Sequence, residues 1–258
     1  MQAMTNENDL LRFFLNHKEN KILKWRHYFD VYDRYFSKYR GLPVRILEIG
    51  VFDGGSLHMW RDYFGTDAQI FGIDILPECK KLEDDGFHIS IGSQTDRSFL
   101  RAFLASTEPF DIILDDGGHT MRQQITTFQE LYKHVKPDGL YLCEDMHTSY
   151  WSKYGGGIRR PGTFMEYSKK MVDQLNAWHS EQSRFHVDQI TKTTYSVHYY
   201  DSIVVFEKRL MNPPEKMETG EYSIVDYDRM TNRSLGQRIQ GRLYMMASQV
   251  LRLLHLPE

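Results

Sequence analysis

VRILEIGVFDGGSLHMWRDYF, residues 44–64, is the part of the sequence from which a fold class can be inferred first. Residues 44–51 form a short apolar run with several β-branched side chains, which is typical of a strand buried in a parallel sheet. A glycine-rich turn follows, and residues 56–64 have the spacing of a helix. A buried strand, a glycine turn and a helix in this order predict one unit of an α/β fold.

Strands and helices continue to alternate along the chain. Further strands are predicted at residues 69–75, 87–92, 110–116 and 140–145, with helices at 96–106 and 121–135. After a predicted helix at 163–178, the runs at 185–190, 195–200 and 202–208 also resemble strands. This alternation predicts a parallel sheet that is covered by helices on both faces.

The first forty residues are expected to be a helical extension. Apolar and ring side chains recur there at three- and four-residue steps: Ile22, Trp25, Tyr28, Phe29, Tyr32, Tyr35, Phe36 and Tyr39. This spacing indicates one face of a helix, and we expect most of that face to pack on the body of the protein. The α/β domain is predicted to follow at residues 41–210.

Residues 211–258 are predicted to be a helical tail. Its last part, residues 234–256, carries an apolar stripe at helical spacing: Leu235, Ile239, Leu243, Met246 and Val250. Basic residues lie opposite the stripe: Arg238, Arg242 and Arg252. We expect this helix to serve docking or oligomer formation, and contact with a membrane surface is the alternative.

Composition excludes several classes of protein. The 258 residues include 32 lysines and arginines against 35 acids, so nothing indicates a nucleic-acid partner. Two cysteines, Cys79 and Cys143, exclude a disulfide scaffold and an all-cysteine metal site. No apolar run reaches the roughly 18 residues of a membrane-spanning helix, and residues 1–14 lack the pattern of a secretory signal. We therefore expect a cytoplasmic protein.

The turn after the first predicted strand suits a small anion. Ligands of open parallel sheets bind beyond the carboxyl ends of the strands. Gly50, Gly54 and Gly55 permit a tight turn, and the helix that begins at Ser56 offers free N–H groups. The spacing G-x-x-x-G-G differs from the dinucleotide-binding G-x-G-x-x-G, and no phosphate-loop lysine follows. A carboxylate is therefore the expected anion, and Glu48 within the strand could attract a cationic amine.

The second and third strand ends carry residues suited to a nucleoside. Asp74 can accept hydrogen bonds from both hydroxyls of a ribose. Gly92 would allow a flat base to approach, and Ser93 and Gln94 come directly after it. Gln94 is expected to read the edge of that base.

Acidic residues follow the fourth and fifth predicted strands. Asp115 and Asp116 end the fourth strand, and Glu144 and Asp145 end the fifth. Neighbouring parallel strands lie about 4.8 Å apart, so these carboxylates can converge on one point. Converging carboxylates need a cation, or one of them must be protonated. Ligands that are all oxygen favour a hard ion such as Mg²⁺. His119 follows at the edge of that site, and histidine ordinarily titrates near neutrality, as a general base should.

Together these motifs resemble the class I S-adenosylmethionine-dependent methyltransferases. The resemblance is carried by the E-x-G-x-x-x-G-G turn, the acid after the second strand and the polar turn after the third. The string DDGGHTMRQQITTFQELYKHVKPDGLYLCEDMHTSYWSKYGGG, residues 115–157, is similar to one branch of that superfamily. This branch comprises the Mg²⁺-dependent sugar O-methyltransferases of macrolide biosynthesis, with their cephalosporin hydroxylase-like and rhamnosyl O-methyltransferase relatives. The similarity extends from about Lys24 to Lys208.

The resemblance implies a Rossmann-like α/β fold and assigns roles to individual residues. The implied sheet has seven mostly parallel strands with the last one antiparallel, and the helical extensions flank it. Asp116, Glu144 and Asp145 occupy the positions of the Mg²⁺ ligands, and Asp116 and His119 those of the catalytic centre, with His119 as the general base. Residues at the strand ends would hold S-adenosylmethionine: Glu48, Gly50, Gly54, Gly55, Ser56, Asp74, Ser93, Gln94 and Asp115.

A long loop at residues 147–163, rich in glycine and aromatic residues, is expected to cover the acceptor. Candidate substrate contacts lie in its first half: His147, Tyr150, Trp151 and Tyr154. His147 is also the rival candidate for the general base. The macrolide enzymes carry a large extra domain that the short N-terminal region does not match.

We therefore expect an O-methyltransferase that uses S-adenosylmethionine and Mg²⁺. Its acceptor would be a sugar hydroxyl of a glycan, glycolipid or glycosylated natural product, and the enzyme would form a homo-oligomer. One alternative is a metal-dependent hydroxylase, hydrolase or other non-methylating enzyme on the same fold. A NAD-dependent oxidoreductase is disfavoured by the glycine spacing, and a non-catalytic cofactor-binding subunit by the intact acids at both strand ends.

Overall fold

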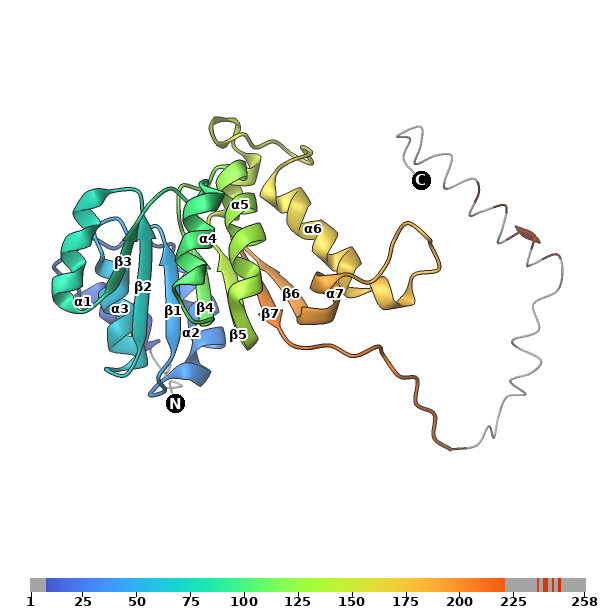
Figure 1. Cartoon of the computed structure of the whole chain (residues 1–258), viewed down its shortest axis with the longest axis horizontal. Coiled ribbons are helices and arrows are strands. Elements are labelled where there is room, and N and C mark those ends of the chain that lie inside the picture. The colour runs from blue at the N-terminus through green and yellow to red at the C-terminus, as the bar shows by residue number, and fades with distance from the viewer. Residues whose placement is uncertain (1–7, 221–235, 237–238, 241–242, 244–245, 247–258) are drawn as a thin grey trace, which may run out of the picture. The chain divides into compact units, whose positions relative to one another are not determined.

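The computed structural model describes residues 8–220 and, beyond them, residues 236, 239, 240, 243 and 246 (Figure 1). The chain divides into two compact units between Pro213 and Pro214. In the second unit the five isolated residues are helical, and Ile239, Leu243 and Met246 of the predicted stripe are among them. The other stripe and basic positions predicted for the tail lie outside the described residues: Leu235, Arg238, Arg242, Val250 and Arg252.

Within residues 8–220, a seven-stranded sheet forms the centre of the first unit, with strand order β3-β2-β1-β4-β5-β7-β6 (Figure 1). Its strands are β1 (Arg45–Ile49), β2 (Gln69–Asp74), β3 (His88–Ile91), β4 (Phe110–Asp115), β5 (Val135–Cys143), β6 (Thr194–Tyr200) and β7 (Ile203–Lys208). The first five strands are parallel, and β7 pairs antiparallel with both β5 and β6. The predicted sheet, mostly parallel with an antiparallel last strand, is confirmed.

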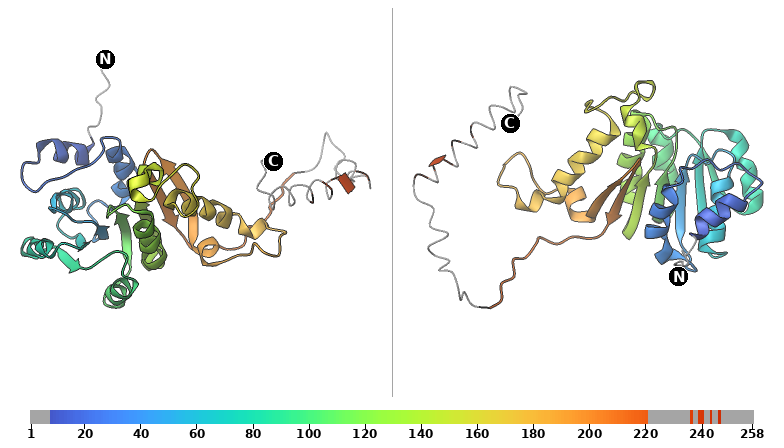
Figure 2. Two further views of the ribbon diagram at one scale, coloured as in Figure 1. Left: turned by 90° about the horizontal axis from the view of Figure 1, so that it is seen from above. Right: turned by 180° about the vertical axis from the view of Figure 1, so that it is seen from behind.

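Helices flank this sheet (Figure 2). The α-helices are α1 (Asp9–Asn16), α2 (Tyr28–Phe36), α3 (Gly55–Phe64), α4 (Arg97–Ala105), α5 (Met121–Leu131), α6 (Phe164–Leu175) and α7 (Gln189–Thr193). Short 3-10 helices join them: η1 (Ser37–Tyr39), η2 (Pro77–Asp85), η3 (Tyr132–His134), η4 (Met146–Tyr150), η5 (Ser152–Tyr154) and η6 (Ala177–His179). Among the described residues, none of these helices has the length and apolar character that a membrane span requires.

Alternating strand residues contribute to two separate cores, one on each face of the sheet. Ile112 and Leu114 of β4 pack in the core that includes α1, α2 and α3. Ile113, between them, packs in the core that includes α4, α5 and α6. Strand side chains point alternately to the two faces, so a strand buried on both faces is apolar throughout. This explains the apolar stretch from Ile112 to Leu114 in the sequence.

One predicted strand is wrong. Residues 185–188 have no regular structure, and helix α7 begins at Gln189. The cause is local. The Asp188 side chain accepts a hydrogen bond from the Thr191 N–H at 2.9 Å, and the Thr191 hydroxyl accepts one from the Asp188 N–H at 3.3 Å. This reciprocal cap satisfies the first N–H groups of a helix, which the apolar composition of the segment does not reveal.

The predicted N-terminal helix is interrupted. Residues 9–16 and 28–36 are helical, whereas residues 17–27 form a loop that contains Ile22 and Trp25 of the predicted face. The remaining aromatic residues of that face, from Tyr28 to Phe36, are buried in the core, as expected. The loop, named loop 17–27 below, passes along the edge of the sheet where the site lies.

An ion-pair cluster joins α5 to α4. The Glu130 carboxylate is almost fully buried and accepts hydrogen bonds from Arg97 and from two nitrogens of Arg101, both at 2.9 Å. Lys133 lies 3.7 Å from the same carboxylate. The hydrogen bond from Arg101 outweighs the effect of burial, and with the other cations it lowers the pKa of Glu130 from 4.5 to about 2.

We expect this cluster to stabilise the fold above pH 4.5 and to lose that effect as the pH falls toward 2. The unfolded chain binds the proton more readily than the folded one, so unfolding is favoured on acidification. Both arginines are well exposed to solvent, so the contribution should be roughly 1–2 kcal/mol. In urea unfolding, Glu130→Gln should be destabilised at pH 7, and more than half of that difference from the wild type should be gone at pH 3. Glu166→Gln, which breaks an exposed pair with Lys169, should change little at either pH, and a Glu130 effect independent of pH would contradict the assignment.

Candidate functional site

A cavity of about 460 Å³ lies at the carboxyl ends of strands β1, β2, β3 and β4. Its walls are the turn after β1, the ends of the next strands and part of loop 17–27. Nine residues that the sequence analysis assigned to the ligand site line it: Gly50, Ser56, Asp74, Gly92, Ser93, Gln94, Asp116, His119 and Asp145. The residues predicted to form the site at separate strand ends therefore line one cavity.

The glycines of the turn make close backbone contacts. Gly50 has a φ of +91°, and a Cβ there would lie 2.2 Å from the carbonyl oxygen of Asp116. A Cβ on Gly55 would lie 2.2 Å from the carbonyl oxygen of Asn20, so this glycine allows loop 17–27 to rest on the start of α3. Gly54 contacts Leu82. Gly54 and Gly55 thus border other segments rather than the cavity, and their contact with a cofactor stays a prediction.

Asp74 holds the turn in place from the end of β2. One carboxylate oxygen, Oδ2, accepts hydrogen bonds from the N–H groups of Val51 and Phe52, both at 2.8 Å. The other, Oδ1, accepts one from the Leu76 N–H at 2.9 Å. The carboxylate fixes the shape of the cavity wall, and its predicted contact with a ribose remains to be tested.

Gln94 and Asp115 brace the loop that follows β4. The Gln94 amide nitrogen donates to Asp115 Oδ1 at 3.2 Å and to Thr127 at 3.0 Å, while its oxygen accepts from the Gly118 N–H at 2.7 Å. Asp115 is buried and also accepts from the Tyr141 hydroxyl at 3.1 Å. Burial raises the pKa of Asp115 to about 7. Both side chains are bonded within the protein, and their predicted roles toward a cofactor stay predictions.

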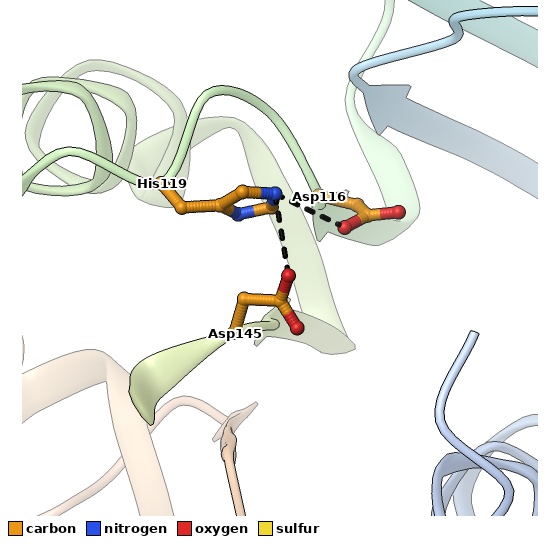
Figure 3. Close-up of side chains that lie close together, drawn as sticks. All are labelled: Asp116, His119 and Asp145. Atoms are coloured by element: carbon orange, nitrogen blue, oxygen red, sulfur yellow. Dashed lines mark ion pairs between the residues drawn. The ribbon is translucent and has the colours of Figure 1, made fainter. Parts of the chain in front are cut away.

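Three side chains from two neighbouring strand ends come together at the edge of the cavity (Figure 3). His119 Nε2 lies 3.8 Å from Asp116 Oδ1 and 3.4 Å from Asp145 Oδ2. One ligand atom from each residue lies within 4.8 Å of the others, so the three could hold a metal ion. The sheet register explains this, because Asp115 of β4 pairs with Cys143 of β5 and the following residues leave the sheet together.

Left-handed backbone conformations and two hydroxyl groups, those of Thr148 and Tyr28, fix the positions of His119 and Asp145. His119 and Asp145 both have left-handed backbones, with φ values of +56° and +53°. The Thr148 hydroxyl lies within hydrogen-bond distance of both carbonyl oxygens, at 2.9 Å from that of His119 and 2.8 Å from that of Asp145. Tyr28 donates to Asp145 Oδ1 at 2.7 Å. Left-handed non-glycine residues cost energy and are concentrated at functional sites, which fits this pair.

Glu144, the remaining predicted metal ligand, contacts different partners, Tyr32 and Lys24. It accepts a hydrogen bond from the Tyr32 hydroxyl at 2.5 Å and from Lys24 Nζ at 3.0 and 3.1 Å. Lys24 Nζ also donates to Asp116 Oδ2 at 2.5 Å and lies 3.7 Å from Glu48 Oε1. A buried ammonium thus occupies the centre of three carboxylates.

The charges of this cluster depend on one another. Burial raises the pKa of Glu144 well above its ordinary value, and the neighbouring Asp116 charge raises it further while Lys24 opposes both. Burial also raises the pKa of Glu48, to about 7, against the effect of Lys24. Burial alone would lower the pKa of Lys24, but the surrounding acids outweigh it and raise that pKa. A positive charge or a bound proton relieves the repulsion in this cluster, and the ammonium of Lys24 supplies a positive charge.

Sequence reasoning did not single out Lys24 or Tyr32 as site residues. Lys24 is 92 residues from Asp116 and 120 from Glu144, and no local pattern links them. Tyr32 fits its predicted place on a buried helix face, and only its hydroxyl enters the site.

Aromatic side chains form an exposed edge beside Asp145. The His147 ring lies 4.5 Å from the ring of Trp151 and 5.8 Å from that of Trp25, measured between centroids. Trp25 and Trp151 are 54% and 43% exposed, and Tyr150 is 50% exposed. Tyr154 lies 6.0 Å from Trp151. His147, Trp151 and Tyr154 thus form one group of rings with Trp25 of loop 17–27, and contact of these residues and Tyr150 with substrate stays a prediction.

No family model matches the chain. Among curated proteins, the chain is 34% identical over 218 residues to the 8-demethyl-8-(2-methoxy-α-L-rhamnosyl)-tetracenomycin-C 3′-O-methyltransferase of Streptomyces olivaceus, a match that covers 80% of this chain and 55% of the relative. It is 35% identical over 193 residues to the mycinamicin VI 2″-O-methyltransferase of Micromonospora griseorubida, covering 69% and 47% of the two chains. The chain spans about half the length of the curated relatives it matches.

A solved structure with the same fold is the MycE methyltransferase of the mycinamycin biosynthetic pathway in complex with Mg and SAH. It matches with a TM-score of 0.69 and 31% sequence identity, over 79% of this chain and 54% of that chain. A second MycE structure, which also holds mycinamycin VI, matches with a TM-score of 0.68 and 32% identity, over 79% and 53% of the two chains.

Proposed function

Since this chain belongs, by homology and by fold, to the class I methyltransferases that act on sugar hydroxyls, we propose that it transfers a methyl group from S-adenosylmethionine to a sugar hydroxyl. The sugar would be part of a glycosylated natural product, and Mg²⁺ would assist the transfer. One observation carries this proposal. Acidic side chains from two adjacent strand ends converge beside a cavity at the carboxyl end of a parallel sheet, where such sheets bind ligands.

The residues present fit both partners. Asp116 and Asp145 offer carboxylate oxygens, which Mg²⁺ prefers, and Glu144 lies beside them. Asp74 lines the cavity where a ribose would bind, and Ser56 in the first turn of α3 lines it where a carboxylate would meet the start of that helix. When bound, S-adenosylmethionine supplies an electrophilic methyl group and Mg²⁺ supplies positive charge that stabilises the acceptor oxygen as it loses its proton.

His119 is the proposed general base. Its Nε2 would take the proton of the acceptor hydroxyl while the oxygen attacks the methyl carbon. The imidazolium that results lies 3.4 Å from Asp145 and 3.8 Å from Asp116, and both carboxylates stabilise it. Such assistance is typically worth about 10²–10⁴-fold in rate. Trp25 and Trp151 are placed to stack on the apolar face of a sugar.

Methyl transfer to a panel of glycosylated natural products tests the proposal. Purified protein with S-adenosylmethionine and Mg²⁺ should add one methyl group to an acceptor sugar, detected by mass spectrometry. EDTA should stop the reaction and fresh Mg²⁺ should restore it. A conversion that needs iron and no S-adenosylmethionine would instead favour a hydroxylase, and failure to bind S-adenosylmethionine at all would overturn the proposal.

Other expectations from the sequence remain proposals. These are the homo-oligomer, the cytoplasmic location and the division into residues 1–40, 41–210 and 211–258. The chain covers only about half the length of each relative, so its substrate and its assembly are proposals as well.

A further inference from the structure

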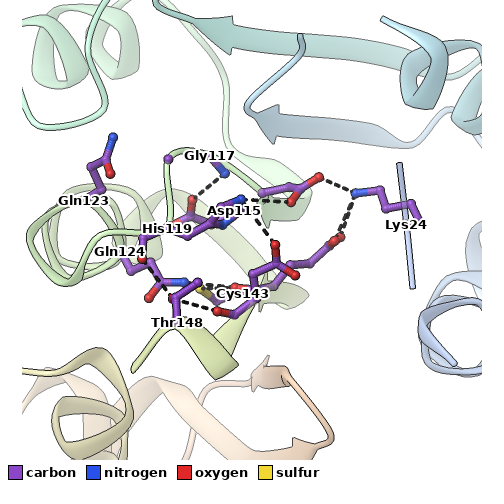
Figure 4. A network of polar contacts seen from close by, with 12 residues as sticks. Lys24, Asp115, Gly117, His119, Gln123, Gln124, Cys143 and Thr148 are labelled. Carbon is purple, nitrogen blue, oxygen red and sulfur yellow. Dashed lines mark hydrogen bonds and ion pairs between the residues drawn. The ribbon is translucent and has the colours of Figure 1, made fainter. Parts of the chain in front are cut away.

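Lys24 reaches from loop 17–27 into the carboxylate cluster (Figure 4). Its side chain is only 2% exposed, although the loop that carries it lies at the surface. Its Nζ donates to Asp116 Oδ2 and to both oxygens of Glu144, at 2.5 to 3.1 Å. Two of the three carboxylates proposed to bind Mg²⁺ are therefore already bonded to a cation of the protein itself.

The two oxygens of Asp116 face different neighbours. Oδ1 faces His119, which in turn approaches Asp145, whereas Oδ2 accepts the hydrogen bond from Lys24. Asp116 thus separates two adjacent cation positions, one filled by the Lys24 ammonium and one open to the cavity. Two positive charges that share one carboxylate repel each other strongly where water is scarce.

Glu144 makes the two positions exclusive. One of its oxygens accepts from both Tyr32 and Lys24, and the other accepts from Lys24. While these bonds hold, the carboxylate cannot turn toward Asp145. A divalent ion held jointly by Asp116, Glu144 and Asp145 therefore requires Lys24 to release Glu144.

We propose that Lys24 is a tethered cation that occupies the Mg²⁺-binding carboxylates in the metal-free protein and withdraws when Mg²⁺ binds. The identity of the ion rests on the proposed function. Lys24 neutralises buried acids that would otherwise repel one another, and it also lowers the affinity for the metal because the metal must displace it. Lys24 is a positioning residue, because it acts through the carboxylates and moves away from the site before methyl transfer.

Withdrawal of Lys24 changes the walls of the cavity. Its neighbours in loop 17–27, Lys21, Ile22 and Leu23, line the same space as Asp74 and Gly50. The loop is fixed to the turn after β1, because the Lys21 N–H donates to Asp53 Oδ2 at 2.6 Å. Metal binding and cofactor binding are therefore coupled, and linkage requires the coupling to act in both directions.

Calorimetric titration with MgCl₂ alone, at constant pH, tests the proposal. Lys24→Met should bind Mg²⁺ at least tenfold more tightly than the wild type, because no ammonium has to be displaced. Lys24→Arg keeps the charge and should bind no more tightly than the wild type. Lys18→Met, which removes an exposed charge from the same loop, is the matched control and should also behave as the wild type. Equal or weaker binding by Lys24→Met would overturn the proposal.

A measurement on the wild type covers the case in which Lys24→Met does not fold. Amine labelling followed by mass spectrometry should modify Lys24 slowly without metal and several-fold faster with saturating Mg²⁺, while Lys18 stays unchanged. Labelling of Lys24 that Mg²⁺ leaves unchanged or slows would overturn the proposal.

If Mg²⁺ binds every variant alike, this inference fails and the methyltransferase proposal stands. If Mg²⁺ binds none of them, both fail.

Discussion

Asp116→Asn should lower Mg²⁺-dependent methyl transfer by roughly a thousandfold. Asp116 is the side chain that borders both cation positions, with one oxygen toward His119 and the other toward Lys24. The asparagine has nearly the same shape but no charge, so it removes a metal ligand and the partner of a buried ammonium together. Steady-state kinetics and Mg²⁺ titration should both record the loss.

Two comparisons separate this effect from unfolding. In the absence of Mg²⁺, SAH should bind to Asp116→Asn with an affinity close to that of the wild type, because the cavity wall around Asp74 is unchanged. Asp67→Asn, an exposed substitution of the same kind, should leave kinetics and metal affinity as they were. Wild-type turnover in Asp116→Asn would exclude this carboxylate from the metal site.

His119→Ala should lower kcat by about 10²–10⁴-fold, the range expected for loss of a positioned general base. SAH and Mg²⁺ should still bind, because the carboxylates that hold them are intact. Added imidazole should restore part of the activity, since a small base can enter the space that the ring leaves.

His147→Ala is the control for this second prediction. His147 is the rival base, but its Nδ1 lies 2.5 Å from the Ser202 hydroxyl, and its ring packs against Trp151. We expect its loss to raise KM more than it lowers kcat. If His119→Ala instead loses Mg²⁺ affinity in proportion to kcat, His119 is a metal ligand rather than the base.

The sheet and the glycine turn could be predicted because their signals are local. Strands buried on both faces are mostly apolar, and residues 44–51 and 110–116 are mostly apolar at their centres. Convergence of the acids could also be inferred. Parallel neighbours end at the same edge of a sheet, so Asp116 and Asp145 had to lie close together once β4 and β5 were adjacent.

Contacts between distant segments could not be predicted in this way. The ammonium of Lys24 meets Asp116 across 92 residues, and loop 17–27 has no periodicity that would place it over the site. Glu144 follows the same strand as Asp145, yet it bonds to Lys24 and Tyr32 instead of facing His119. Side-chain direction at a strand end depends on such partners, which a strand pattern does not contain.

The failed strand at 185–190 has a different physical origin. Its composition suits a strand, but the hydrogen bonds between Asp188 and Thr191 begin a helix at Gln189. Capping competes with β-propensity over a few residues, and propensity is the weaker of the two effects.

Anomalous diffraction from crystals grown with SAH and Mn²⁺, a scattering substitute for Mg²⁺, would show whether Asp116 and Asp145 bind a metal ion beside the cofactor. We predict one strong peak within about 2.5 Å of carboxylate oxygens of both Asp116 and Asp145, next to SAH in the cavity at the carboxyl ends of β1, β2, β3 and β4. SAH bound in that cavity with no peak between these two carboxylates would contradict it.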